Sequence, residues 1–187
     1  MATATRPYRM TARADAARAT AERILDAAAD LFFADPSEES SLDAIAARAG
    51  VSKQTVLRHF GTKDDVLAAA TDRAVARFVA ERDAVTRGDV AGAVAAVVAH
   101  YERVGDGVLR MLAEEHRSPL LRERAALGRE LHERWCRRVF APRTPRRLAQ
   151  VIAVTDVYTW KLLRRDRGLS RAQTELAMRE LIEGVTP

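Results

Sequence analysis

Residues 42–60 read LDAIAARAGVSKQTVLRHF and contain two short helical patterns on either side of a glycine. Gly50 can take the left-handed conformation that ends a helix, and Ser52 is a good N-cap for the helix that follows. A helix-turn-helix also needs a small residue where its helices cross and an apolar residue in the turn, and Ala46 and Val51 meet these needs. The stretch therefore predicts a helix-turn-helix.

The second helix of this motif is rich in hydrogen-bond donors. The donors are Lys53, Gln54, Thr55, Arg58 and His59. An ordinary helical hairpin with a hydrated polar face is the alternative, but this many donors, with Lys63 just beyond, favours a DNA-binding surface. Of these side chains, Gln54 suits an adenine edge and Arg58 suits a guanine edge.

The rest of the chain also has helical periodicity, so the expected fold is all-α. Glycines, prolines and capping residues divide it into nine expected helices, and no segment has the alternation of a strand. Their approximate ranges are 17–34, 42–49, 53–60, 62–85, 89–104, 108–112, 118–140, 146–165 and 170–184. Residues 1–12 are expected to lie outside any helix, Gly105 and Gly107 to break one, and Asp156 to lie in the middle of one.

The composition excludes several classes of protein. The chain has 187 residues, a net charge of +5 and a single cysteine, Cys136. One cysteine allows no intrachain disulfide and no thiolate zinc cage. The longest apolar run, residues 90–99, is about half of what a bilayer span needs. With no secretory signal at the N-terminus, a cytoplasmic protein without membrane contact is expected. No nucleotide-binding or catalytic motif is present, so we expect neither an enzyme nor a cofactor.

Three segments resemble the N-terminal domain of the TetR family of transcriptional repressors. They are RILDAAADLF, SLDAIAARAGVSKQTVLRHF and TKDDVLAAA, in the family's order and spacing. A fourth segment, near the C-terminus, is similar to the final two helices of family members and reads TWKLLRRDRGLSRAQTELAMRELIEGV. The resemblance implies a DNA-binding domain over residues 1–62 and a helical ligand-binding and dimerisation domain over residues 63–187.

The implied function is that of a homodimeric regulator. It would bind an imperfect palindrome in double-stranded DNA, most often as a repressor, and release it when a small molecule binds. The resemblance places Thr55, His59 and Lys63 on the DNA backbone, and Ser41, Ser52, Lys53, Gln54 and Arg58 on base edges or nearby phosphates.

Two positions depart from the family pattern, and one basic segment has two interpretations. Leu57 stands where relatives carry a phosphate-binding tyrosine, and Pro36–Ser37 replaces a glycine followed by an aromatic residue. An N-terminal arm carries Arg6, Arg9, Arg13 and Arg18. It is either a minor-groove arm or a solubilising tail.

Ligand and dimer residues follow from the family layout. The expected pocket residues are Phe78, Tyr101, Met111, Trp135, Asp156 and Tyr158, each of which could instead simply fill the core. Asp156, if it points inward, needs a partner such as a cationic or hydrogen-bonding ligand. The expected dimer residues are Val151, Thr155, Leu162, Met178 and Leu181.

The sequence also contains one pair of residues that could bind a metal, and it allows two alternative functions. His132 and Cys136 share a helical face, but two ligands do not define a metal site, so no metal is predicted; a buried thiol is the more common case. The rival functions are a DNA-binding protein without sequence preference and a helical ligand carrier or enzyme with a vestigial helix-turn-helix.

Overall fold

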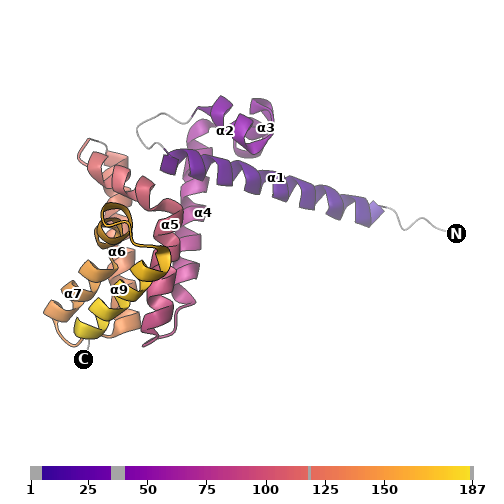
Figure 1. Ribbon diagram of the computed structural model, residues 1–187. Helices are drawn as coiled ribbons and strands as arrows, with labels where there is room; N and C mark the ends of the chain where they lie inside the picture. Colours follow the sequence, from indigo (N-terminus) through magenta and orange to yellow (C-terminus); the bar gives the residue numbers. More distant parts are fainter. Residues whose placement is uncertain (1–5, 35–40, 118, 186–187) are drawn as a thin grey trace. The chain divides into compact units, whose positions relative to one another are not determined.

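The computed structural model describes residues 6–34, 41–117 and 119–185, and every regular element in these ranges is a helix (Figure 1). The chain divides into two compact units, Met1–Val75 and Ala76–Pro187. The division falls inside one long helix, α4, whereas the sequence-based boundary between residues 62 and 63 lies at the start of that helix. The all-α prediction is confirmed.

The first unit packs three helices and the first half of a fourth around a small core. They are α1 (Arg6–Ala34), α2 (Leu42–Ala49), α3 (Lys53–Phe60) and α4 (Lys63–Asp83). Each contributes to the buried cluster, which includes Ile24, Ile45, Val56 and Val66. Since most of the other members are alanines, the helices can approach one another closely.

Helix α1 is longer than its apolar stripe predicts. The prediction that residues 6–12 lie outside a helix is wrong, because α1 begins at Arg6. Pro7 is compatible with a first helical turn, whose N–H groups need no intrahelical partner. No glycine or proline follows until Pro36. Residues 1–5 and the Pro36–Ser37 loop lie outside the described residues.

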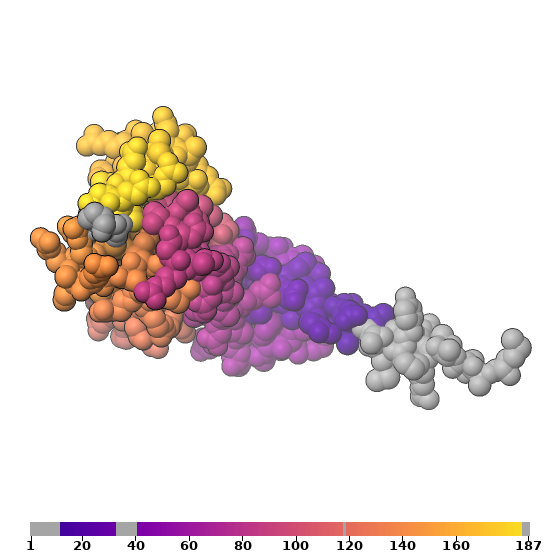
Figure 2. All heavy atoms as spheres, turned by 90° about the horizontal axis from the view of Figure 1, so that it is seen from below, coloured from indigo at the N-terminus to yellow at the C-terminus, as the bar shows by residue number. Residues whose placement is uncertain are grey.

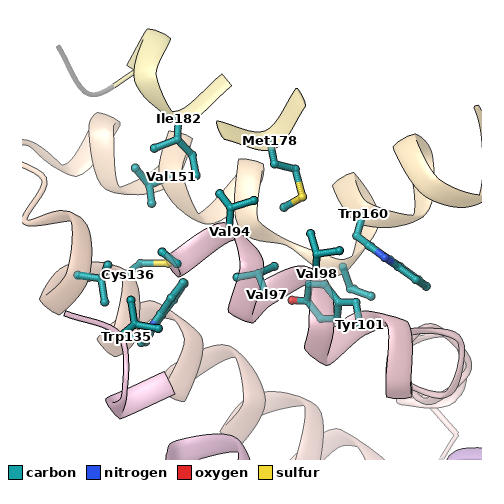
Figure 3. Close-up of a cluster of buried hydrophobic side chains, with 14 of the residues drawn as sticks. Val94, Val97, Val98, Tyr101, Trp135, Cys136, Val151, Trp160, Met178 and Ile182 are labelled. Atoms are coloured by element: carbon teal, nitrogen blue, oxygen red, sulfur yellow. The ribbon is translucent and has the colours of Figure 1, made fainter. Parts of the chain in front are cut away.

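The second unit joins the end of α4 to the remaining helices. They are α5 (Val90–Glu114), α6 (Pro119–Phe140), α7 (Pro145–Thr155), α8 (Val157–Lys161), the π-helix η1 (Leu162–Asp166) and α9 (Arg171–Val185). Helix α5 packs against α6, α8 and α9, and α7 packs against α6 and α9 (Figure 1). Met178 and Ile182 of α9 point toward Val94 of α5, and Trp135 and Cys136 of α6 complete the same cluster (Figure 3).

Helix α5 corrects the prediction that Gly105 and Gly107 break a helix. It runs without interruption through both residues, which are buried. A Cβ atom on Gly105 would lie only 2.5 Å from Cζ3 of Trp160. Gly105 is therefore needed because the Trp160 ring packs against the α5 backbone, and not because the chain turns there.

The predicted helix over residues 146–165 is also wrong, because it is interrupted at Asp156. The backbone of Asp156 is extended, with φ −77° and ψ 156°, and its carboxylate accepts a hydrogen bond of 2.9 Å from the Tyr158 N–H. Asp156 is thus the N-cap of α8, which turns directly into η1. A capping carboxylate already has its backbone partner and needs no ligand.

The start of α9 is formed as expected. Gly168 has a φ of 68°, and Ser170 caps the helix by accepting a 3.2 Å hydrogen bond from the Gln173 N–H. The Gln173 side chain accepts in return from the Ser170 N–H at 2.9 Å, which completes a capping box. None of the described helices combines the length and apolar character that crossing a lipid bilayer requires.

The Gly105–Trp160 contact leads to a prediction about stability. Gly105→Ala should lower the free energy of unfolding by roughly 1–3 kcal/mol, because the added methyl group overlaps the ring in a packed core. Gly128→Ala is the matched control: its Cβ would have nothing within 4 Å, so it should stabilise α6. Urea unfolding of both variants measures this, and a neutral Gly105→Ala would contradict it.

Candidate nucleic-acid interface and ligand site

The turn between α2 and α3 is held by capping hydrogen bonds at both ends. Gly50 takes the left-handed conformation, with φ 67° and ψ 38°. The Gly50 N–H donates to the Ala47 carbonyl at 3.2 Å, and the Val51 N–H donates to the Ala46 carbonyl at 3.0 Å. Ser52 then accepts a 3.2 Å hydrogen bond from the Thr55 N–H. These contacts fix the direction in which α3 leaves the turn.

The inner faces of the two helices are buried together. Ile45 and Val56 are fully buried, and Ala46 is 4% exposed at the crossing where the sequence requires a small residue. Because α3 is held by its core side and by its N-cap, its outer side chains stand on a rigid support.

The outer face of α3 carries most of the predicted DNA contacts. Lys53, Gln54 and Arg58 are exposed, and Thr55 and His59 are half-buried. Gln54 and Arg58 are one turn apart and so share a face. The Lys53 ammonium lies 3.0 Å from Oδ2 of Asp43 on α2, an exposed ion pair that a phosphate could replace.

Ser41 and Ser52 have capping roles in addition to their predicted place at the interface. Ser41 Oγ accepts from the Ala44 N–H at 3.1 Å, and Ser52 Oγ lies 2.9 Å from Thr55 Oγ1. Thr62 caps α4, accepting from the Asp65 N–H at 3.2 Å, which places the half-buried Lys63 in the first turn of that helix. Backbone N–H groups at such helix starts are themselves phosphate ligands.

The remaining unusual and basic positions whose side chains the structure describes are exposed. Leu57 is 37% exposed, so it does not pack beneath α3. Arg13 and Arg18 are exposed on α1, and Arg18 forms a 3.0 Å ion pair with Asp15. The side chains of Arg6 and Arg9 lie outside the described residues.

Comparisons with known proteins agree with this geometry. Residues 24–70 match the family model described as "Bacterial regulatory proteins, tetR family". This segment is similar to the TetR-family DNA-binding domain. The matched segment covers the end of α1, the helix-turn-helix and the first turns of α4, and it supports a DNA-binding regulator.

A solved structure shows the same fold over most of the chain. It is a transcriptional regulator from Rhodococcus sp. Rha1, 24% identical, with a TM-score of 0.64 over 88% of this chain and 95% of that chain. A comparison with curated proteins gives no match.

The predicted ligand residues do not all lie in one place. Tyr101 and Trp135 are buried in the core of the second unit, and Met111 is buried outside that cluster. Phe78 is half-buried beside His100, with ring centroids 5.0 Å apart. Tyr158 is 56% exposed and Asp156 is a helix cap, so the structure gives neither an inward-facing role.

Three of the predicted dimer residues are also buried within one chain. Val151, Thr155 and Met178 are each 0% exposed, so their side chains are not available to a partner chain. Thr155 Oγ1 instead donates to the Val151 carbonyl at 2.8 Å and lies 3.0 Å from Nε2 of His132. Leu162 and Leu181 remain candidates, at 47% and 48% exposed.

Two residues that the sequence did not single out lie at the centre of the second unit, namely Arg82 and His100. Arg82 is 3% exposed, and its guanidinium carbon lies 4.3 Å from the Trp135 ring centroid and 5.0 Å from that of Phe78. Its position was visible as the next member of the α4 series Ala70, Ala74 and Phe78, spaced by four residues.

The histidine, cysteine and tyrosine side chains around Arg82 are neutral at physiological pH. Burial, and then the positive charge of Arg82, lower the pKa of His100 and of His132 to about 3. Burial raises the pKa of the Cys136 thiol to about 11, and it also raises that of Tyr101. Cys136 Sγ lies 3.7 Å from His132 Nε2, but within the described ranges no three metal-binding side chains gather. A protonated buried thiol is also a poor redox sensor.

The neutral state of His132 makes stability depend on pH. The pKa of His132 is about 3 in the folded chain and 6.5 in the unfolded chain. Between these values the unfolded chain binds a proton at this residue and the folded chain does not. Stability is therefore lost as the pH falls from 6.5 toward 3. At pH 5 the loss from this residue should be roughly 2 kcal/mol.

Urea unfolding at pH 7 and pH 5 tests this. His132→Asn should lose less stability on acidification than the wild type, because one proton uptake is removed. The exposed His116→Asn is the control and should follow the wild type. A wild-type pH dependence in His132→Asn would show that this histidine does not cause the effect.

Proposed function

We propose that this chain is a repressor that binds a palindromic operator as a homodimer and releases it when a small molecule, the effector, binds to the second unit. It acts by binding and not by catalysis. The observation that carries the proposal is the rigidly capped α3, whose outer face exposes Gln54 and Arg58. Arg and Gln side chains on a recognition helix pair with guanine and adenine edges in the major groove.

The two kinds of DNA contact have different effects. We assign Thr55, His59 and Lys63 to phosphates, which set affinity and register, and Gln54 and Arg58 to base edges, which set sequence preference. Lys53 exchanges Asp43 for a phosphate when the helix enters the groove. Two such units related by a two-fold axis would then read two half-sites of a palindrome.

The dimer is proposed to form through the C-terminal helices. Leu181 of α9 and Leu162 of η1 are half-exposed apolar side chains, and α9 lies on the surface of its unit (Figure 2, yellow). A four-helix interface with a second copy would cover them. The effector would act through α4, since this one helix contributes residues to both units.

Gln54→Ala tests the base-reading assignment. We expect it to lose roughly 1–3 kcal/mol of discrimination at one symmetric pair of operator positions and to keep most of its affinity for unrelated DNA. The operator is first selected from a library of random duplexes, and fluorescence anisotropy then compares it with a scrambled duplex.

Lys63→Ala is the control for this measurement and should weaken binding to both duplexes alike. Equal losses on both duplexes for Gln54→Ala would remove Gln54 from the specificity residues. If the wild type itself bound both duplexes alike, the sequence-specific function would be wrong.

Leu181→Arg tests the dimer. The wild type should sediment as a dimer at micromolar concentration without DNA, and the variant should be a monomer because its charge would be buried. Leu176→Arg is the matched control: Leu176 is 45% exposed on the same helix but lies about 140° around its axis, so its variant should stay dimeric. A dimeric Leu181→Arg would move the interface elsewhere.

A further inference from the structure

The buried guanidinium of Arg82 lacks a counter-ion. Its Nη1 and Nη2 atoms have no hydrogen-bond partner among the described residues, although the side chain is 3% exposed. Buried donors are normally paired, and an unpaired buried charge is costly. The backbone at Arg82 is by contrast well held, since its carbonyl accepts from Trp135 Nε1 at 3.1 Å and from Arg138 Nη2 at 2.6 Å.

The environment of Arg82 covers the faces of the guanidinium and leaves its charge without a counter-ion. Trp135 and Phe78 each lie within cation–π distance. The five N–H donors of an arginine lie in the guanidinium plane, so these rings do not satisfy them. The Tyr101 hydroxyl interacts with the Arg82 guanidinium as a weak polar neighbour that raises the pKa of Arg82, but it is neutral, donates to the Thr155 carbonyl at 3.3 Å and brings no negative charge.

Glu81, the acidic side chain whose charge acts on Arg82, is already paired. Glu81 Oε2 lies 2.7 Å from the Arg103 guanidinium, and Glu81 Oε1 lies 2.9 Å from that of Arg77. These pairs contribute to lowering the Glu81 pKa. With neutral histidines and a neutral thiol on the other sides, Arg82 is a lone cation inside an otherwise uncharged cluster.

The same cluster contains one unpaired hydrogen-bond acceptor, on His132. Thr155 Oγ1 uses its proton on the Val151 carbonyl, so it accepts from the Nε2–H of His132. The Nδ1 of His132 is then an unprotonated acceptor that has no hydrogen-bond partner in the described part of the chain. The requirement that decides the class of ligand is the cation of Arg82, which calls for an anionic group.

We propose that Arg82 is the anion-binding residue of the effector site and that the effector is a small aromatic carboxylate. The carboxylate would take Nη1 and Nη2 as a bidentate pair, and the aromatic body would pack among Phe78, Trp135 and the two histidines. One cation among neutral groups fits a monoanion better than a phosphate, which carries more charge. The inference rests on the proposed function only for its effect on DNA.

The position of Arg82 gives this site a route to regulation. Arg82 lies in the last turn of α4, and its carbonyl is held by Trp135 and Arg138 of α6. A ligand that enters between the guanidinium and these rings must shift the Trp135 side chain. It thereby changes the hold on the end of α4, the helix that continues into the first unit.

Binding is tested on the full chain without DNA, with benzoate as the probe. Quenching of Trp135 and Trp160, the two tryptophans of the chain, reports it. We expect benzoate to bind at least about tenfold more tightly than benzamide, which has the same shape without the charge, as one buried charge-assisted pair requires. Equal affinities, or no binding by benzoate, would overturn the proposal, and tighter binding of inorganic phosphate would overturn the aromatic class.

Variants assign the binding to this residue. Arg82→Met should abolish the difference between benzoate and benzamide without lowering the stability of the ligand-free chain, because an uncompensated charge is removed. If Arg82→Met does not fold, Arg82→Lys keeps the charge but loses the bidentate fork and should still weaken benzoate binding. Arg103→Met is the control and should keep the wild-type difference between benzoate and benzamide. If Arg103→Met also loses this difference, the assignment of the anion to Arg82 is wrong.

The DNA experiment separates this inference from the proposed function. Benzoate should lower the affinity of the wild type for the selected operator and leave that of Arg82→Met unchanged. If the operator binds but benzoate does not, the anion site is wrong and the DNA-binding function stands. If benzoate binds without changing DNA affinity, Arg82 is not an effector residue.

Discussion

The carbonyl oxygen of Arg82 is the point on which the arrangement of the second unit depends. Two donors from α6, the Trp135 indole and the Arg138 guanidinium, meet on this one acceptor, which also accepts from the Val85 N–H at 3.2 Å. Arg138 also donates to the Val85 carbonyl at 3.0 Å. The last carbonyls of a helix lack intrahelical partners, so side-chain donors are what fix its end. These hydrogen bonds tie the end of α4 to the core of the second unit, and the first half of α4 belongs to the first unit.

The helix-turn-helix could be predicted from the sequence because its determinants are local. Gly50, Ser52 and Thr62 act on the backbone within a few residues, so their capping roles are visible without knowledge of the fold. The errors occur where distant residues decide. Gly105 looks like a helix break until Trp160 is known to lie against it, and Asp156 looks like a residue of a continuous helix until its capping bond is seen.

The DNA-contact residues could also be predicted from the sequence, whereas the proposed ligand residues could not. The exposed donors of α3 follow from one amphipathic helix and its cap, so Gln54 and Arg58 could be named from the sequence. The ligand cluster could not, because it takes residues from α4, α5, α6 and α7 whose only common property is their position. Buried aromatic residues such as Trp135 have the same sequence signal whether they fill a core or line a site, and only the unpaired atoms of Arg82 distinguish the two.

The lone buried cation of Arg82 lowers the stability of the fold, which suggests that a function retains it. Burying an arginine without a carboxylate costs free energy that a methionine or leucine would not cost at the same position. Residues that reduce stability in this way are usually retained because a function needs them. The rings of Phe78 and Trp135 offset part of the cost through cation–π contact but leave the in-plane donors unsatisfied. The chain thus keeps a charge that only an anion can neutralise, at the end of the helix that its two units share.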